Sequence, residues 1–337
     1  MTREALIEIL AKLCTARGIS GNEGRAAETA LSLLSAHCAD AHLSHGNVVG
    51  TFGSPDGIHV LLDAHLDQVG MIVTSVTEDG FVTVGNIGGL DRRLLPVQKV
   101  YIEGTKVLPG IISTLPPHLT DGSESVMKIE DVRIDTGFSA EELRQLVHPG
   151  DSVYFDGVTG CLPGGRFTSP ALDDRCGIAA ILYALDALKE ETLPCHVTVQ
   201  FSTEEEVVER GAKIGCYAAD PDIAIAVDVS FAGDGKRSKT GRMGEGAMIG
   251  FSPSLSRELS DALTDAAHDS GIPYQVEVMS GTTGTNADQF SVCRGGVRAC
   301  TVSIPLDYMH TPVEAIDLAD VELTGELLAA YLRRCGK

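Results

Sequence analysis

Apolar and polar residues follow two different rhythms along this chain. Apolar side chains recur every three or four positions over residues 3–16 and 22–38, which predicts two amphipathic helices. β-type runs follow at 47–52 and 58–62. After residue 163 we expect helices near 174–189, 209–218, 255–270 and 319–334 and strands at 196–203, 223–229, 273–279 and 297–304. This alternation is typical of an α/β fold in which helices cover both faces of a mostly parallel sheet.

The stretch from about 70 to 163 has a different texture. Short β-type runs alternate there with Gly, Pro and Asp turns, and almost no long helical pattern appears. Such spacing predicts a small β-barrel or sandwich inserted into the first domain. We therefore expect a discontinuous catalytic domain, 1–69 with 164–337, and an inserted β domain, 70–163.

Composition narrows the function classes. The net charge of -21 argues against nucleic acid or an anionic membrane as a partner. The first twenty residues mix acidic and basic side chains and lack the apolar core of a signal peptide, and no apolar run reaches spanning length. Nine cysteines without a CxxC pair argue against a disulfide framework. A cytoplasmic protein is expected.

Five residues of the types that bind metals each follow an apolar, strand-like run. They are His65, Asp173, Glu206, Asp228 and His310. The carboxyl ends of strands in an open α/β sheet converge where ligands bind. Two histidines and three carboxylates supply the mixed nitrogen and oxygen ligands that a pair of zinc-like ions requires, with one carboxylate shared. The conjunction predicts a two-metal hydrolase.

Each residue taken alone also has an ordinary interpretation. Asp173 precedes a predicted helix and is a good N-cap candidate. Glu206 ends a run of three glutamates that a solvated acidic turn would also explain. His310 by itself is typical of a hydrogen-bonded core histidine. In the triplet that begins at His65, the i, i+2 spacing would let the Asp67 carboxylate accept the imidazole N–H and orient the ring.

Several short motifs, in order and spread over nearly the whole chain, resemble one known family. This family is the dinuclear metallo-aminopeptidases that include the tetrahedral and glutamyl aminopeptidases, often labelled cellulase M-like. The matching stretches are Ala64-His65-Leu66-Asp67, Ala171-Leu172-Asp173-Asp174-Arg175, Glu205-Glu206-Val207 with Arg210-Gly211-Ala212, Asp228-Val229-Ser230, Gly271-Ile272-Pro273-Tyr274, and Ile304-Pro305 with Tyr308-Met309-His310-Thr311-Pro312-Val313-Glu314.

The resemblance implies a zinc-peptidase fold and two divalent metal ions per subunit, zinc or cobalt before manganese. It implies that His65, Asp173 and Asp228 hold one ion. It implies that Asp173, Glu206 and His310 hold the other. The inserted β domain would help to assemble a homo-oligomer, with a twelve-subunit shell as a common form in the family.

The resemblance also implies roles around these ligands. Glu205 would be the general base, and Asp67 would orient His65. Similar enzymes place a cis peptide after the shared carboxylate, so we predict a cis or strongly strained Asp173-Asp174 bond. The expected reaction is hydrolysis of the N-terminal peptide bond of short peptides, which carry a free N-terminus.

The chain departs from the family pattern at several positions. Glu204 and Val208 replace the Gln and Gly that usually flank the paired glutamates, and Gln68 replaces a common Glu. Asn286 stands where an Asp is common and Asp307 where an Arg is common. None of these changes removes a proposed ligand, but Asn286 and Asp307 bear on substrate preference and subunit contacts.

Alternative functions remain open at this level. One is a different amide hydrolase on the same metal scaffold, such as a deacylase or carboxypeptidase. Another is a catalytically silent, metal-stabilised shell protein, although a structural site needs no base such as Glu205. A glycosidase would need two facing carboxylates and a sugar cleft, which the sequence does not indicate.

Overall fold

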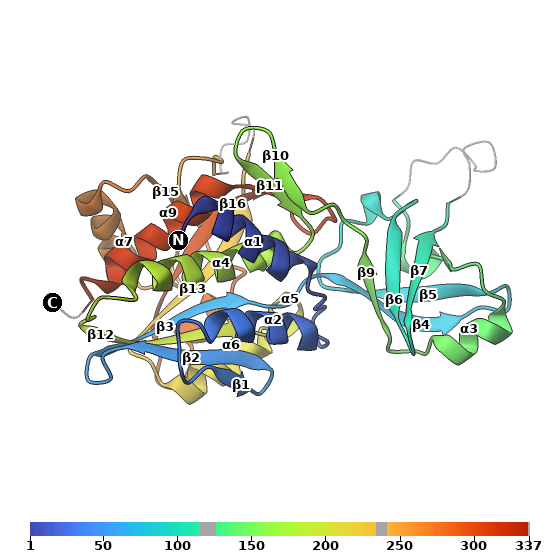
Figure 1. The fold of residues 1–337 in the computed structure, drawn as a ribbon, viewed down its shortest axis with the longest axis horizontal. Helices are drawn as coiled ribbons and strands as arrows, with labels where there is room; N and C mark the ends of the chain where they lie inside the picture. The colour runs from blue at the N-terminus through green and yellow to red at the C-terminus, as the bar shows by residue number, and fades with distance from the viewer. Residues whose placement is uncertain (115–125, 234–240, 336–337) are drawn as a thin grey trace.

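The computed structural model describes residues 1–114, 126–233 and 241–335. These residues form a larger α/β part and a smaller β part beside it (Figure 1). The larger part is built on an eleven-stranded mixed sheet. Its strands are β1 (His42–Ser44), β2 (Asn47–Gly53), β3 (Ile58–His65), β10 (Gly160–Leu162), β11 (Arg166–Ser169), β12 (Cys195–Ser202), β13 (Ile223–Phe231), β14 (Ala247–Phe251), β15 (Tyr274–Val278), β16 (Arg298–Asp307) and β17 (Glu314–Asp317).

The centre of this sheet is parallel and its margins are antiparallel. β12, β3, β13 and β16 run parallel to one another, while β2, β17 and β14 pair antiparallel with β12 or β16. Because the central strands share one direction, their carboxyl ends meet at one edge. This edge is where ligands bind in open α/β sheets.

Helices cover both faces of the sheet (Figure 1). They are α1 (Arg3–Thr15), α2 (Gly24–Leu34), α4 (Leu172–Leu188), α5 (Glu205–Val208), α6 (Arg210–Ala219), α7 (Arg257–Ser270), α8 (Ala287–Ser291) and α9 (Leu318–Leu332). Successive residues of a strand point to opposite faces of the sheet and so pack in different apolar cores. Val60 and Leu62 pack in the core that contains α1, α4 and α9, whereas Leu61 packs with α6 and α8. Because both faces of the central strands are buried, their sequences are continuous apolar runs.

The smaller part is a closed six-stranded barrel with the strand order β4-β5-β8-β7-β6-β9. Alternate residues of each strand, such as Val82 and Val84, fill its own apolar core. Its strands are β4 (Gly70–Val76), β5 (Phe81–Ile87), β6 (Lys99–Glu103), β7 (Val107–Ile112), β8 (Ile134–Asp135) and β9 (Ser152–Phe155). Two 3-10 turns, η1 (Arg92–Leu94) and η3 (Ile129–Asp131), and helix α3 (Ala140–Leu146) accompany them.

The predicted fold class is confirmed, with an inserted barrel and a helix-covered sheet. The pattern did not reveal the short elements β1, β10, β11, β14, β17, α3, α5 and α8. Residues 115–125 of the predicted insertion lie outside the described residues. Among the described residues, no helix combines the length and apolar character that crossing a membrane requires.

Candidate metal centre

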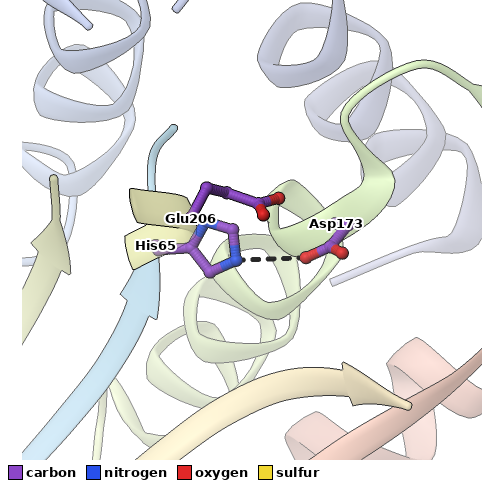
Figure 2. Close-up of side chains that lie close together, drawn as sticks. All are labelled: His65, Asp173 and Glu206. Carbon is purple, nitrogen blue, oxygen red and sulfur yellow. Dashed lines mark hydrogen bonds and ion pairs between the residues drawn. The ribbon is translucent and has the colours of Figure 1, made fainter. Parts of the chain in front are cut away.

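His65 lies at the carboxyl end of the central strand β3. It is 1% exposed, and its partner in the parallel register is Ser202, the last residue of β12. Its Nε2 lies 3.0 Å from Oδ1 of Asp173, and Figure 2 shows the two side chains facing each other. Its Nδ1 lies 3.0 Å from the main-chain oxygen of Asp67 and 3.5 Å from Oδ1 of that residue. The main-chain carbonyl of Asp67, rather than the expected carboxylate, is therefore the nearer acceptor.

Asp173 lies at the start of α4 but does not cap the helix. The neighbouring Asp174 does so, because its Oδ1 accepts the N–H of Gly177 at 3.2 Å. Its Oδ2 accepts the backbone N–H of His65 at 3.1 Å. The peptide bond between the two aspartates is cis, as predicted. The Asp174 carboxylate thus accepts hydrogen bonds from the backbone, and the buried Asp173 carboxylate faces the histidines.

Of the three adjacent glutamates, the first contacts an arginine and the other two contact the histidines. Glu204 adopts a left-handed conformation with φ 58° and pairs with Arg210. Glu205 and Glu206 begin α5, and the Oε2 atoms lie 3.9 Å from His65 Nε2 and 3.3 Å from His310 Nε2, respectively. A turn at the end of β12 thus places both carboxylates beside the histidines (Figure 2 for Glu206).

Asp67 holds this turn in place. Its Oδ1 accepts the N–H of Glu205 at 3.0 Å, and its Oδ2 accepts the N–H of Glu206 at 3.1 Å and the hydroxyl of Ser20 at 2.6 Å. The carboxylate is fully buried. Asp67 therefore fixes the backbone of both glutamates as well as lying against the His65 ring.

Asp228 and His310 complete the cluster from two further strands. Asp228 lies within β13, is 6% exposed, and offers an oxygen within 4.8 Å of ligand atoms of His65 and Asp174. His310 follows β16, and its Nε2 lies 3.3 Å from Oδ2 of Asp173. The structure thus brings together all five predicted ligand residues.

Glu314 is a part of the site whose role the sequence did not reveal. Its Oε2 accepts the N–H of Asp173 at 3.0 Å and its Oε1 accepts the N–H of His310 at 2.8 Å. One buried carboxylate thus ties two segments that are far apart in the sequence. The signal that could have found it is its place in the His-Thr-Pro-Val-Glu motif, four residues after His310.

The electrostatics of the cluster are those of crowded, buried acids. Burial, with the nearby carboxylates of Asp228 and Glu206, raises the pKa of Glu205 to about 10 against the opposing effect of His65. Burial likewise raises the pKa of Asp228 to about 8. Burial opposes protonation of His310, yet contacts with Asp173 and Glu206 raise its pKa to about 11. In the metal-free fold, Glu205 and Asp228 thus hold protons at neutral pH that bound cations would displace.

These residues fit divalent cations. Oε1 of Glu206 is buried without a hydrogen-bond partner among the described residues, a costly state unless something else binds it. Ligand atoms of His65, Asp173 and Glu206 lie within 4.8 Å of one another, as do those of His65, Asp174 and Asp228. Imidazole nitrogens and carboxylate oxygens are the donors that zinc and similar ions accept.

Comparison with known proteins agrees with this geometry. The family model described as M42 glutamyl aminopeptidase matches residues 46–327. The chain belongs to this family. M42 peptidases are metal-dependent aminopeptidases, a class of hydrolases. The lysyl aminopeptidase of Pyrococcus furiosus is 30% identical over 338 residues, with 96% of each chain covered.

Solved structures of peptidases share the architecture of this chain. An aminopeptidase from the archaeon Desulfurococcus kamchatkensis has 32% identity and a TM-score of 0.92, covering 98% of this chain and 95% of the other. The TET1 peptidase of Pyrococcus horikoshii has 31% identity and a TM-score of 0.87, covering 97% and 99%. The latter is described as able to assemble into a tetrahedron or a large octahedral shell. Large oligomers therefore occur among proteins of this architecture.

Proposed function

We propose that this chain removes N-terminal residues from short peptides with two divalent cations bound between His65 and His310. The observation that carries the proposal is the position of the Asp173 carboxylate. Its Oδ1 lies 3.0 Å from Nε2 of His65, and its Oδ2 lies 3.3 Å from Nε2 of His310. One carboxylate with its two oxygens directed at two separate imidazoles is the arrangement expected of a bridging ligand.

The neighbours divide into two sets around this bridge. Asp228 offers an oxygen within 4.8 Å of a ligand atom of His65. Asp173 contacts the same histidine, so we assign His65, Asp173 and Asp228 to one ion. Glu206 contacts His310, so we assign Asp173, Glu206 and His310 to the other. Zinc or cobalt is the expected metal, with manganese as a further choice, because mixed nitrogen and oxygen sites accept several divalent ions.

Glu205 is assigned as the general base. Its carboxylate lies beside His65, and its side chain retains 11% exposure, so it borders the site without filling it. Two cations held by these residues would acidify an attacking water, polarise the scissile carbonyl and keep neighbouring carboxylates ionised. Glu205 then accepts the water proton and delivers it to the leaving amine. Asp67 holds Glu205 in place through its backbone N–H.

The remaining assignments concern the assembly. We propose a cytoplasmic homo-oligomer, with a dodecamer as the first form to test. This proposal is supported by the assemblies described for similar peptidases. We assign the barrel, within the inserted domain 70–163, to assembly and access.

The test is a panel of aminoacyl amides and their N-acetyl counterparts, assayed with zinc, cobalt or manganese. An aminopeptidase cleaves the free-amine substrates and leaves the acetylated ones intact. A deacylase would release acetate from acetylated substrates, and a carboxypeptidase would act only on peptides with a free carboxyl end. No turnover of this panel with any metal would overturn the proposal and leave the carboxypeptidase and the silent shell protein, which peptides with a free carboxyl end would then distinguish.

A further inference from the structure

The two histidines of the centre differ in what fixes their rings. His65 ends a strand of the sheet, whereas His310 lies three residues beyond β16 in a left-handed conformation with φ 61°. A strand therefore does not set the direction of the His310 ring. The ring has one hydrogen-bond acceptor for Nδ1 among the described residues, the main-chain oxygen of Gly89, at 2.8 Å.

Gly89 belongs to the barrel, in the loop between β5 and η1. This loop is fixed on both sides. The Asn86 side chain donates to the carbonyl of Gly88 at 2.8 Å, and the Asp91 side chain accepts the N–H of Arg93 at 3.1 Å. Gly88 itself lies close to Val69 and to Glu206, because a Cβ placed on it would come within 2.7 Å of Val69 and 3.4 Å of Glu206. The loop therefore packs directly against the metal centre.

The barrel is also anchored to the larger part on a second side. The Glu103 carboxylate on β6 forms an ion pair with Arg25 at 3.1 Å. The Asn22 side chain donates to Ser152 at 3.1 Å and to Glu103 at 3.5 Å. These contacts, together with the loop at Gly89, fix the barrel relative to the sheet.

We propose that the barrel is a working part of the metal centre, because the Gly89 carbonyl orients His310. The carbonyl accepts the Nδ1–H of His310, which leaves Nε2, the nitrogen beside Asp173 and Glu206, as the one available to a cation. A histidine ligand usually donates its other N–H to such an acceptor, and loss of the acceptor weakens metal binding. Gly89 is a positioning residue, and the inference rests on the proposed metal site.

The variant Gly89→Ala tests this directly. A Cβ at this position would lie 3.0 Å from Nδ1 and 3.3 Å from Cε1 of His310, so the ring must move. Gly89 is not among the residues with positive φ, so alanine fits its backbone. The matched control is Gly85→Ala on β5, where a Cβ would meet its nearest neighbour, Cγ2 of Ile72, at 3.6 Å, an ordinary contact.

The primary measurement is metal binding without substrate, by dialysis against buffered zinc and by the visible spectrum of the cobalt-loaded protein. We expect the displaced His310 ring in Gly89→Ala to lose its hydrogen bond to the carbonyl of residue 89, so that the variant binds one of its two ions about 10–100-fold more weakly, the range seen when an outer partner of a histidine ligand is lost. His310→Ala identifies that ion, because it should lose the same one. Gly85→Ala should bind both ions as the unchanged protein does.

A second variant covers the case in which Gly89→Ala does not fold. Asn86 is exposed, and Asn86→Ala releases the loop without adding bulk beside His310. It should weaken the same ion by a smaller factor. The inference would be overturned if Gly89→Ala bound both ions as tightly as the control Gly85→Ala. If Gly89→Ala is unfolded, the same result for Asn86→Ala would overturn it.

The outcome is separable from that of the proposed function. If the unchanged protein cleaves no aminoacyl substrate but Gly89→Ala still loses affinity for one ion, the peptidase assignment fails and the role of Gly89 stands. If the unchanged protein is active and Gly89→Ala binds both ions normally, the role of Gly89 fails and the peptidase assignment stands.

Discussion

The His65 and His310 halves of the centre offer the same chemistry on different supports. His65 is 1% exposed and is the last residue of β3, a strand that pairs with β12 on one side and with β13 on the other. The His310 side chain is 26% exposed and belongs to a loop held by Glu314 and by Gly89 of the barrel. A loop with few buried contacts opens at lower free energy than a central strand. We therefore expect the ion on the His310 side to be the first to leave.

The largest expected effect is on activity, and it distinguishes the proposed base, Glu205, from the proposed ligand, Glu206. Glu205→Gln keeps the shape of the side chain but cannot accept a proton, so kcat should fall by about 10²–10⁴-fold. Its metal content should remain two ions per chain, whereas Glu206→Gln should lose the ion on the His310 side. Metal analysis and steady-state kinetics of both variants measure this. The reverse pattern, with metal lost from Glu205→Gln, would exchange the two assignments.

Removal of metal should make stability depend on pH. The pKa of Asp228 is raised to about 8 and that of His310 to about 11 in the metal-free fold, so the folded state binds protons more tightly than the unfolded state. The free energy of unfolding then falls as pH rises, for Asp228 from about 4 to 8 and for His310 from about 6.5 upward, by a few kcal/mol in all.

Thermal unfolding with a chelator, between pH 5 and 8, checks this expectation. The metal-loaded protein is the control, because bound cations take the place of these protons and should flatten the curve. Stability that rises with pH in the metal-free protein would contradict the sign.

Glu314 links the two halves, because its carboxylate binds the backbone of both Asp173 and His310. Glu314→Gln replaces one acceptor oxygen with an NH₂ group and leaves the N–H of Asp173 or of His310 unpaired, at a cost of about 1–3 kcal/mol. Metal affinity should fall about 10–100-fold. Denaturant unfolding and zinc titration measure both. Glu322→Gln, which removes only an ion pair with Arg3, should cost at most about 1 kcal/mol.

The smallest expected effect concerns substrate choice on the His310 side. Asp307 ends β16, three residues before His310. If it faces the substrate, it disfavours acidic side chains, and Asp307→Ala should improve glutamyl relative to lysyl substrates by roughly fivefold, as expected for about 1 kcal/mol of exposed charge interaction. Values of kcat/KM on glutamyl, leucyl and lysyl substrates test it. A glutamyl preference in the unchanged protein that persists in Asp307→Ala would refute this role.

The sequence by itself determined what depends on local pattern. Apolar periodicity is a property of neighbouring residues, so it predicted the long helices, the central strands and the barrel texture. The strand ends also pointed to the five candidate ligands, since parallel strands bring their carboxyl ends together. The short strands β14 and β17 were not predicted, because each contains too few residues for its apolar pattern to be recognised.

The tertiary structure alone decided how these residues are held. Asp173 and Asp174 are adjacent and chemically alike, and packing against His65 makes one of them the helix cap and directs the other at both histidines. The Gly89 carbonyl reaches His310 across 221 positions in sequence. Every residue except proline carries the same backbone donor and acceptor, so the fold, and not the residue type, selects which of them meet.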